Sequence, residues 1–196
     1  MYDKLAFARM AMEDSHLNTD EFFDVVGFFI FYTRLEYALK EAGYLKRNDN
    51  GSLKNPPEIN LASFSREINK PFFEEWEQVR NEIFYLEDRP PMQRTATVDH
   101  EGRYYLDWTP SDDRFKNLPG ITSRIEDVRN NLFHGNKIYG DDIERDMTLI
   151  RYGLVVMNHC ISVCANLQYT NTKAYQVYSN FTKMPSTTAT VSQKMW

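Results

Sequence analysis

Residues 143–164 read IERDMTLIRYGLVVMNHCISVC, and this stretch decides the fold class. Apolar side chains recur in it at alternating steps of four and three residues, and comprise Ile143, Met147, Ile150, Leu154, Met157, Ile161 and Cys164. That period places one apolar stripe along an α-helix, as in the seam of a helical bundle. We therefore expect a long helix here, with the stripe from Met147 to Ile161 buried against other helices.

Two earlier stretches predict partners for this helix. Residues 22–43, FFDVVGFFIFYTRLEYALKEAG, are apolar over a helical length, with Thr19 as the expected N-cap and Gly43 as the residue that ends the helix. A polar segment with Asn-Gly and Pro-Pro breakers follows and predicts a loop. A second long helix is expected over residues 71–89, because Pro71 suits the first turn of a helix.

Residues 95–108, TATVDHEGRYYLDW, differ from the helical stretches. β-Branched and aromatic residues alternate there around a Glu101-Gly102 turn, which is typical of a hairpin that would lean on neighbouring helices. Helical spacing resumes at Ile121 and continues to His134. The expected fold class is therefore all-α: a helical bundle, residues 1–169, with a small β-hairpin insertion near residues 94–108.

Residues 170–196 form a segment of different composition. It has no acidic residue, three lysines, and rings at Tyr175, Tyr178 and Phe181. Cations interleaved with rings suit a strap that contacts single-stranded RNA. The alternative is a turn of helix packed on the bundle, followed by a loose end.

Composition excludes several classes of protein. A net charge of −5 and a pI near 5.4 argue against a broad basic surface that coats DNA. We expect no membrane span, because no apolar run approaches the roughly 20 residues needed to cross a bilayer. Two cysteines cannot build a disulfide framework, which favours the cytoplasm.

Residues 128–137, VRNNLFHGNK, hold the candidate site. Arg129 is followed by a polar residue, and His134 comes after four intervening positions. Similar Arg–His spacings occur at residues 9–16 and 94–100, but without the adjacent Asn, the surrounding amphipathic helix and the Gly after the His. This motif resembles the signature of the HEPN superfamily, all-α proteins of which many are metal-independent ribonucleases; the resemblance covers roughly residues 20–169.

The resemblance implies an endoribonuclease without cofactor or metal, of the toxin or antiviral defence kind, with RNA as substrate and an antitoxin or other regulatory protein as a possible partner. Residue chemistry agrees with it. His134 titrates near neutral pH and suits general acid–base catalysis on the ribose 2′-OH or the leaving oxygen. Arg129 remains charged and can grip phosphate oxygens. Asn130 could orient either group, and Lys137 could add positive charge.

Helix geometry separates the two principal residues. Arg129 precedes His134 by five positions, so the two side chains diverge by about 140° around an ideal helix. One copy of the motif therefore cannot easily focus both groups on one phosphate. HEPN ribonucleases are dimers with facing motifs, and we expect a homodimer with its active site at the interface.

Two alternatives remain open at this point. Arg129 could instead form a surface pair with Glu126 or Asp127, with His134 merely near the end of a helix. The chain would then be a non-catalytic HEPN-like module that binds a nucleotide or a protein.

The group of His159, Cys160 and Cys164 is expected to pack in the core rather than to bind metal.

Overall fold

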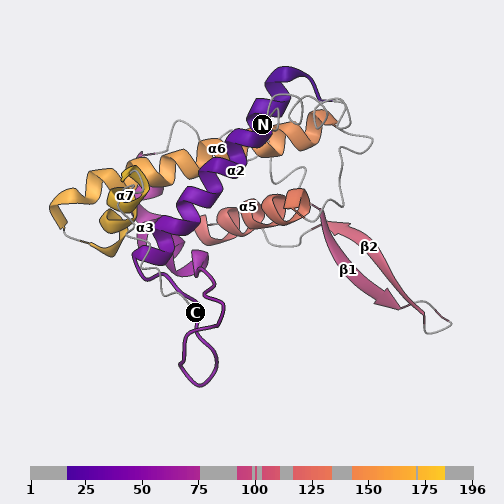
Figure 1. Cartoon of the computed structure of the whole chain (residues 1–196), viewed down its shortest axis with the longest axis horizontal. Coiled ribbons are helices and arrows are strands. Elements are labelled where there is room, and N and C mark those ends of the chain that lie inside the picture. The colour runs from indigo at the N-terminus through magenta and orange to yellow at the C-terminus, as the bar shows by residue number, and fades with distance from the viewer. Residues whose placement is uncertain are drawn as a thin grey trace, which may run out of the picture.

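A computed structural model describes residues 17–75, 92–98, 100, 103–110, 117–133, 143–170 and 172–183. Its helices are α2 (Thr19–Glu41), α3 (Leu61–Glu75), α5 (Leu118–Phe133), α6 (Ile143–Asn166) and α7 (Lys173–Thr182), with a short 3-10 helix, η1 (Leu167–Thr170). The described residues also form two strands, β1 (Met92–Val98) and β2 (Tyr104–Pro110). The described chain is mostly helical, which confirms the expected all-α character (Figure 1).

Helix α2 begins and ends at residues whose side chains or backbone satisfy its free polar groups. Its N-cap is Asn18 rather than the expected Thr19, because the Asn18 side chain accepts from the Glu21 N–H at 3.0 Å while the Glu21 carboxylate accepts from the Asn18 N–H at 2.9 Å. At the other end Gly43 has φ +77°, and the bond from Tyr44 N–H to the Leu39 carbonyl closes the last turn. The expected stop at Gly43 is confirmed.

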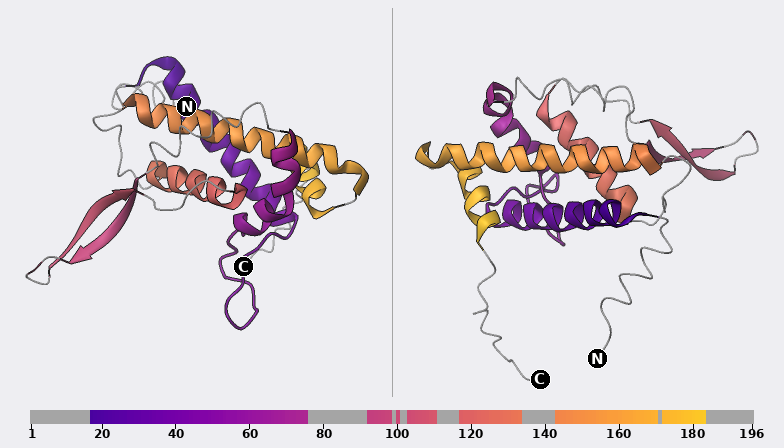
Figure 2. Two further views of the ribbon diagram at one scale, coloured as in Figure 1. Left: turned by 180° about the vertical axis from the view of Figure 1, so that it is seen from behind. Right: turned by 90° about the horizontal axis from the view of Figure 1, so that it is seen from above.

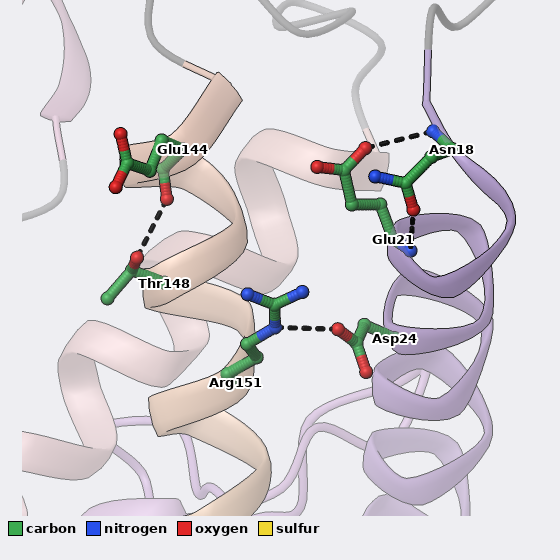
Figure 3. A network of polar contacts seen from close by, with 6 residues as sticks. All are labelled: Asn18, Glu21, Asp24, Glu144, Thr148 and Arg151. Carbon is green, nitrogen blue, oxygen red and sulfur yellow. Dashed lines mark hydrogen bonds and ion pairs between the residues drawn. The ribbon is translucent and has the colours of Figure 1, made fainter.

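Helices α2 and α6 run side by side in the same direction (Figure 2). Near their starts, Arg151 Nε donates to Asp24 at 2.7 Å and ties the two helices together (Figure 3). Further along, Gly153 lets α6 approach the ring of Phe28: a Cβ at this position would lie 2.7 Å from the ring. The pair forms the centre of the hydrophobic core.

The apolar stripe of α6 is buried, with one exception. Met147, Ile150, Met157 and Ile161 are all buried, as the spacing predicts. Leu154 was expected with them but is only half-buried, at the edge of the core. Gly153 occupies the buried position instead, so the stripe shifts by one residue where α6 meets Phe28.

Helix α3 begins ten residues earlier than expected. The side chain of Asn60 accepts from the Ser63 N–H at 2.9 Å and caps the first turn, and Leu61 is the first helical residue. Pro71 lies inside the helix instead of starting it. The expected helix over residues 71–89 is therefore wrong in its start; its residues beyond 75 lie outside the described chain.

Helices α3 and α5 are antiparallel and share buried polar contacts. The hydroxyls of Ser65 and Thr122 lie 2.8 Å apart, and Asn69 accepts from the Leu118 N–H at 2.9 Å. The second bond fixes the first residue of α5 three positions before the expected Ile121. Each of these polar groups has a hydrogen-bond partner, so their burial carries no penalty for unpaired groups. The two contacts therefore set the register of α3 against α5.

Helix α7 closes the bundle against α2 and α6. The Glu67 carboxylate accepts from the Ala174 N–H at 3.2 Å and from the Tyr44 hydroxyl at 2.5 Å, so a negative charge lies at the N-terminus of α7. Lys173 donates to the Gly43 carbonyl at 2.8 Å. This part of the segment 170–196 is thus a packed helix, and residues 184–196 lie outside the described chain.

Strands β1 and β2 pair in antiparallel register, with Ala96 opposite Leu106. Figure 1 shows the pair projecting from the helices rather than lying along them. Among the described helices, α6 alone is long and apolar enough to cross a membrane by length and composition, and 56% of its apolar window is buried inside the structure. The core helix of a bundle meets the same criterion.

Candidate functional site

The first half of the Arg–His motif lies on the last turns of α5. Arg129 and Asn130 belong to the described chain and are both half-buried. His134 and Lys137 lie outside it.

Arg129 reaches from α5 to α2. One terminal nitrogen lies 3.9 Å from a carboxylate oxygen of Glu36, and the other donates to the side-chain oxygen of Asn130 at 2.9 Å. Its guanidinium also lies over the ring of Tyr32, 5.5 Å from the centroid. Tyr32 and Glu36 lie one turn apart on α2 and Asn130 lies on α5, so contacts with two helices restrict the rotamers of a side chain that is otherwise long and flexible.

The Arg129 side chain is only partly shielded from solvent. The Arg129 side chain is 30% exposed and that of Glu36 is 27% exposed. A local pair with Glu126 or Asp127, the alternative role considered for Arg129, would not require this reach across to another helix. A phosphate group would approach Arg129 from the exposed side of this side chain, since phosphate and guanidinium match in geometry and charge.

Glu36 divides its charge between two cations. Besides Arg129 it pairs with Lys40, one turn further along α2, at 2.8 Å. A spacing of four residues brings these two side chains together on one face of the helix. The contact of Glu36 with Arg129 joins two helices, and no spacing along the sequence predicts it.

Tyr32 forms the apolar floor beneath Arg129. Burial raises the pKa of its hydroxyl, and the nearby charges of Glu126 and Glu36 raise it further, while Arg129 opposes them. The phenol therefore stays protonated at neutral pH and offers its ring face to the guanidinium. A cation over such a face is attracted by the ring's quadrupole.

A second arginine of α5, Arg124, was not singled out from the sequence. Its side chain is almost entirely buried, and its guanidinium lies 3.9 Å from the carboxylate of Asp127 on the next turn. A charged residue in an amphipathic helix is usually expected on the exposed face, so the sequence pattern does not predict that Arg124 is buried. Its burial places a second positive charge within the motif helix.

The His–Cys group of α6 lies in the core. Both cysteines are free and buried, and burial, followed by the charge of Glu67, raises the pKa of the Cys164 thiol to about 12. A neutral thiol is a poor metal ligand. His159 lies edge-on to the Phe72 ring, with its Nε2 3.2 Å from the Phe72 carbonyl. Within the described ranges, no three His, Cys, Asp or Glu side chains are placed to hold a metal ion.

The chain was also compared with known proteins. It matches no protein-family model, no curated protein and no solved structure.

Proposed function

We propose that this chain is a metal-independent endoribonuclease of HEPN type, a toxin or antiviral defence effector that works in the cytoplasm as a homodimer. The observation that carries the proposal is the setting of Arg129. The partly exposed side chain of Arg129 contacts Glu36, Asn130 and Tyr32 near the end of α5, and His134 follows this helix in the sequence. An oriented cation beside a histidine is the minimal equipment for cleaving RNA without metal.

The reaction follows from these residue types. Neutral His134 takes the proton of the ribose 2′-OH, and the 2′ oxygen attacks the adjacent phosphorus. The bond from phosphorus to the 5′ oxygen breaks, and the imidazolium form of His134 gives that oxygen its proton. Arg129 stabilises the charge that builds on the phosphate oxygens. The products are a 2′,3′-cyclic phosphate and a 5′-OH.

Glu36 is a positioning residue in this proposal. By pairing with Arg129 it fixes the guanidinium, and by pairing with Lys40 as well it avoids neutralising Arg129 fully. Replacing Glu36 with Gln keeps the size of the side chain and removes its charge. We expect Glu36→Gln to raise KM for RNA or lower kcat without unfolding the protein.

A dimer is supported by the outer face of α2. Phe23 and Ile30 are 63% and 58% exposed, and they lie seven residues apart on one face of the helix. Large exposed apolar side chains on the surface of a folded domain often mark an interface. Phe23 and Ile30 can pack against the same residues of a second copy about a two-fold axis.

The decisive experiment is cleavage of single-stranded RNA in EDTA. We expect wild-type protein to produce 2′,3′-cyclic phosphate ends, and His134→Ala and Arg129→Ala to produce none. Lys70→Ala serves as the control, because it removes an exposed lysine of α3 that pairs with Glu74. A strict requirement for a divalent metal would exclude this mechanism.

One observation favours a second function, a non-catalytic module that binds a nucleotide or a protein. Arg129 already contacts Glu36, Asn130 and Tyr32, and a side chain so engaged can serve the fold alone. This function predicts that His134→Ala leaves cellular activity intact while Ile30→Glu abolishes it. The endoribonuclease predicts that both variants lose the toxicity of the wild type.

A further inference from the structure

A pocket of about 280 Å³ lies where the C-terminal half of α2 meets α7. Thr33, Arg34 and Tyr37 line it from α2, and Asn180, Phe181 and Lys183 line it from α7 and its C-cap. Figure 2 shows α7, in yellow, at this end of α2. The volume is near the lower limit of small-ligand sites and suits one nucleotide better than a larger group.

The floor of the pocket is a fixed structure. Arg34 donates to the Phe181 carbonyl at 2.6 Å, and its guanidinium lies 5.2 Å from the centroid of the Phe181 ring. That ring also packs against Phe31, with centroids 4.8 Å apart. Arg34 is therefore held against the Phe181 ring, and the residue as a whole is exposed.

The walls add a ring and a second cation. Tyr37 is 54% exposed, which is unusual for so large an aromatic side chain, so one face of its ring is open to stack on a ligand. Lys183 is exposed at the C-cap of α7 and lines the same pocket as Arg34. The surface inside the pocket is almost wholly apolar and suits a base, while Arg34 and Lys183 are exposed residues of its lining and carry the charge that a phosphate needs.

We propose that this pocket binds one nucleotide of a single-stranded RNA, with the base against Tyr37 and the phosphate between Arg34 and Lys183. Stacking on an exposed ring together with cations that follow the backbone is how proteins hold single strands without reading sequence. Thr33 and Asn180 supply hydroxyl and amide groups for the ribose or the base edge. RNA as the ligand rests on the proposed ribonuclease function.

The pocket and the contact of Arg129 from α5 involve the same turn of α2. Glu36 contacts Arg129, and the next residue, Tyr37, lines the pocket. Adjacent helical residues point about 100° apart, so the two sites lie on neighbouring sides of a cylinder roughly 10 Å across. A strand that passes around this turn can reach both, and the pocket holds a nucleotide close to the scissile one.

The test measures binding separately from cleavage. A short fluorescent single-stranded RNA is titrated with full-length His134→Ala protein, which leaves the RNA intact, and with the same protein carrying a second substitution. We expect Tyr37→Ala to weaken binding about tenfold and Tyr37→Phe to retain it, because stacking needs only the ring. Lys183→Ala should weaken binding and flatten its salt dependence, whereas Lys70→Ala should do neither.

The outcomes distinguish this inference from the proposed function. Unchanged binding in Tyr37→Ala and Lys183→Ala, or an equal loss in Lys70→Ala, would overturn the pocket assignment even if the wild type cleaves RNA. The expected losses in a protein that never cleaves RNA would support the pocket and refute the catalysis. Tight binding of adenosine 5′-monophosphate, lost in the same variants, without any binding of RNA would overturn the assignment to a strand.

Discussion

Cys164 shows how burial changes a single ionisable group. Its thiol is buried between α6 and its neighbours, and burial and the charge of Glu67 raise its pKa from 9.0 to about 12. In the unfolded chain the same thiol loses its proton near its ordinary pKa. Between about pH 9 and about pH 12 the folded protein therefore binds more protons than the unfolded chain does, and alkali favours unfolding.

We accordingly expect the free energy of unfolding to fall as the pH rises above about 9. The thiol of Cys164 contributes up to roughly 1.4 kcal/mol for each pH unit within this window. Cys164→Ala should flatten the slope above pH 9 and leave the slope below it unchanged. Urea denaturation over a series of pH values checks this, and identical slopes for both proteins would contradict it.

Two glycines on facing helices should respond oppositely to the same substitution. A Cβ at Gly153 would lie 2.7 Å from the Phe28 ring, which is fully buried, while a Cβ at Gly27 would meet nothing within 4 Å. Gly153→Ala should cost about 1–3 kcal/mol through overpacking, less the gain in helix propensity. Gly27→Ala should stabilise by up to about 1 kcal/mol. Thermal unfolding of both variants measures the difference; equal stabilisation would mean that Phe28 moves freely.

At this scale the sequence reveals only part of the site. The motif residues Arg129 and Asn130 can be picked out because their spacing is local. Tyr32 and Glu36 cannot, because they are nearly a hundred positions earlier and meet Arg129 only after α2 and α5 have packed. A helical period says which face is apolar, but it does not say which polar groups two helices will bring together.

Among the elements, α6 offers the cleanest measure of how burial determines stability. Ile150 is buried, whereas Leu154, on the same stripe, is half-buried. Ile150→Ala should cost roughly 2–5 kcal/mol, and Leu154→Ala should cost clearly less because water already reaches part of its side chain. Urea denaturation of the two variants would settle the order, and an equal or larger loss for Leu154→Ala would contradict the observed burial.

The bounds of the elements were predictable where a cap and a period agree. The end of α2 follows from Gly43, and the length of α6 follows from its stripe. The start of α3 was missed because Pro71 resembles a first-turn proline, although Asn60 and the apolar spacing of Leu61, Phe64 and Ile68 mark the true start. A proline inside a helix forfeits one hydrogen bond, and here the burial of Phe72 just after it offsets that loss.

For the whole molecule, the principal prediction is a dimer. Ile30→Glu places a charge on the outer face of α2 and should convert the dimer to monomers and abolish RNA cleavage. Leu53→Glu is the matched control, since Leu53 is also exposed but lies in the loop between α2 and α3. Analytical ultracentrifugation and the EDTA cleavage assay report the two effects. A wild-type monomer with full activity at micromolar concentration would refute the interface.

Mixed dimers test whether the two motifs share a site. If Arg129 of one copy works with His134 of the other, a mixture of Arg129→Ala and His134→Ala chains should recover activity that each alone lacks. If every site needs Arg129 and His134 from both copies, the mixture stays inactive. Recovery would establish simple sharing, and its failure would rule simple sharing out while leaving the dimer prediction to ultracentrifugation.

The contacts of α2 with α6 and α7 also have a consequence for the order of events during synthesis. Arg34 bonds to Phe181 across 147 positions of the chain, Gly43 to Lys173 across 130, and Asp24 to Arg151 across 127. Since the ribosome makes α2 before the other described helices, this helix must wait for nearly all of the described chain before its partners exist. The turn of α2 that carries Glu36 and Tyr37 therefore completes its surroundings only once residues as far as 183 have been made. A nascent chain should stay inactive until then.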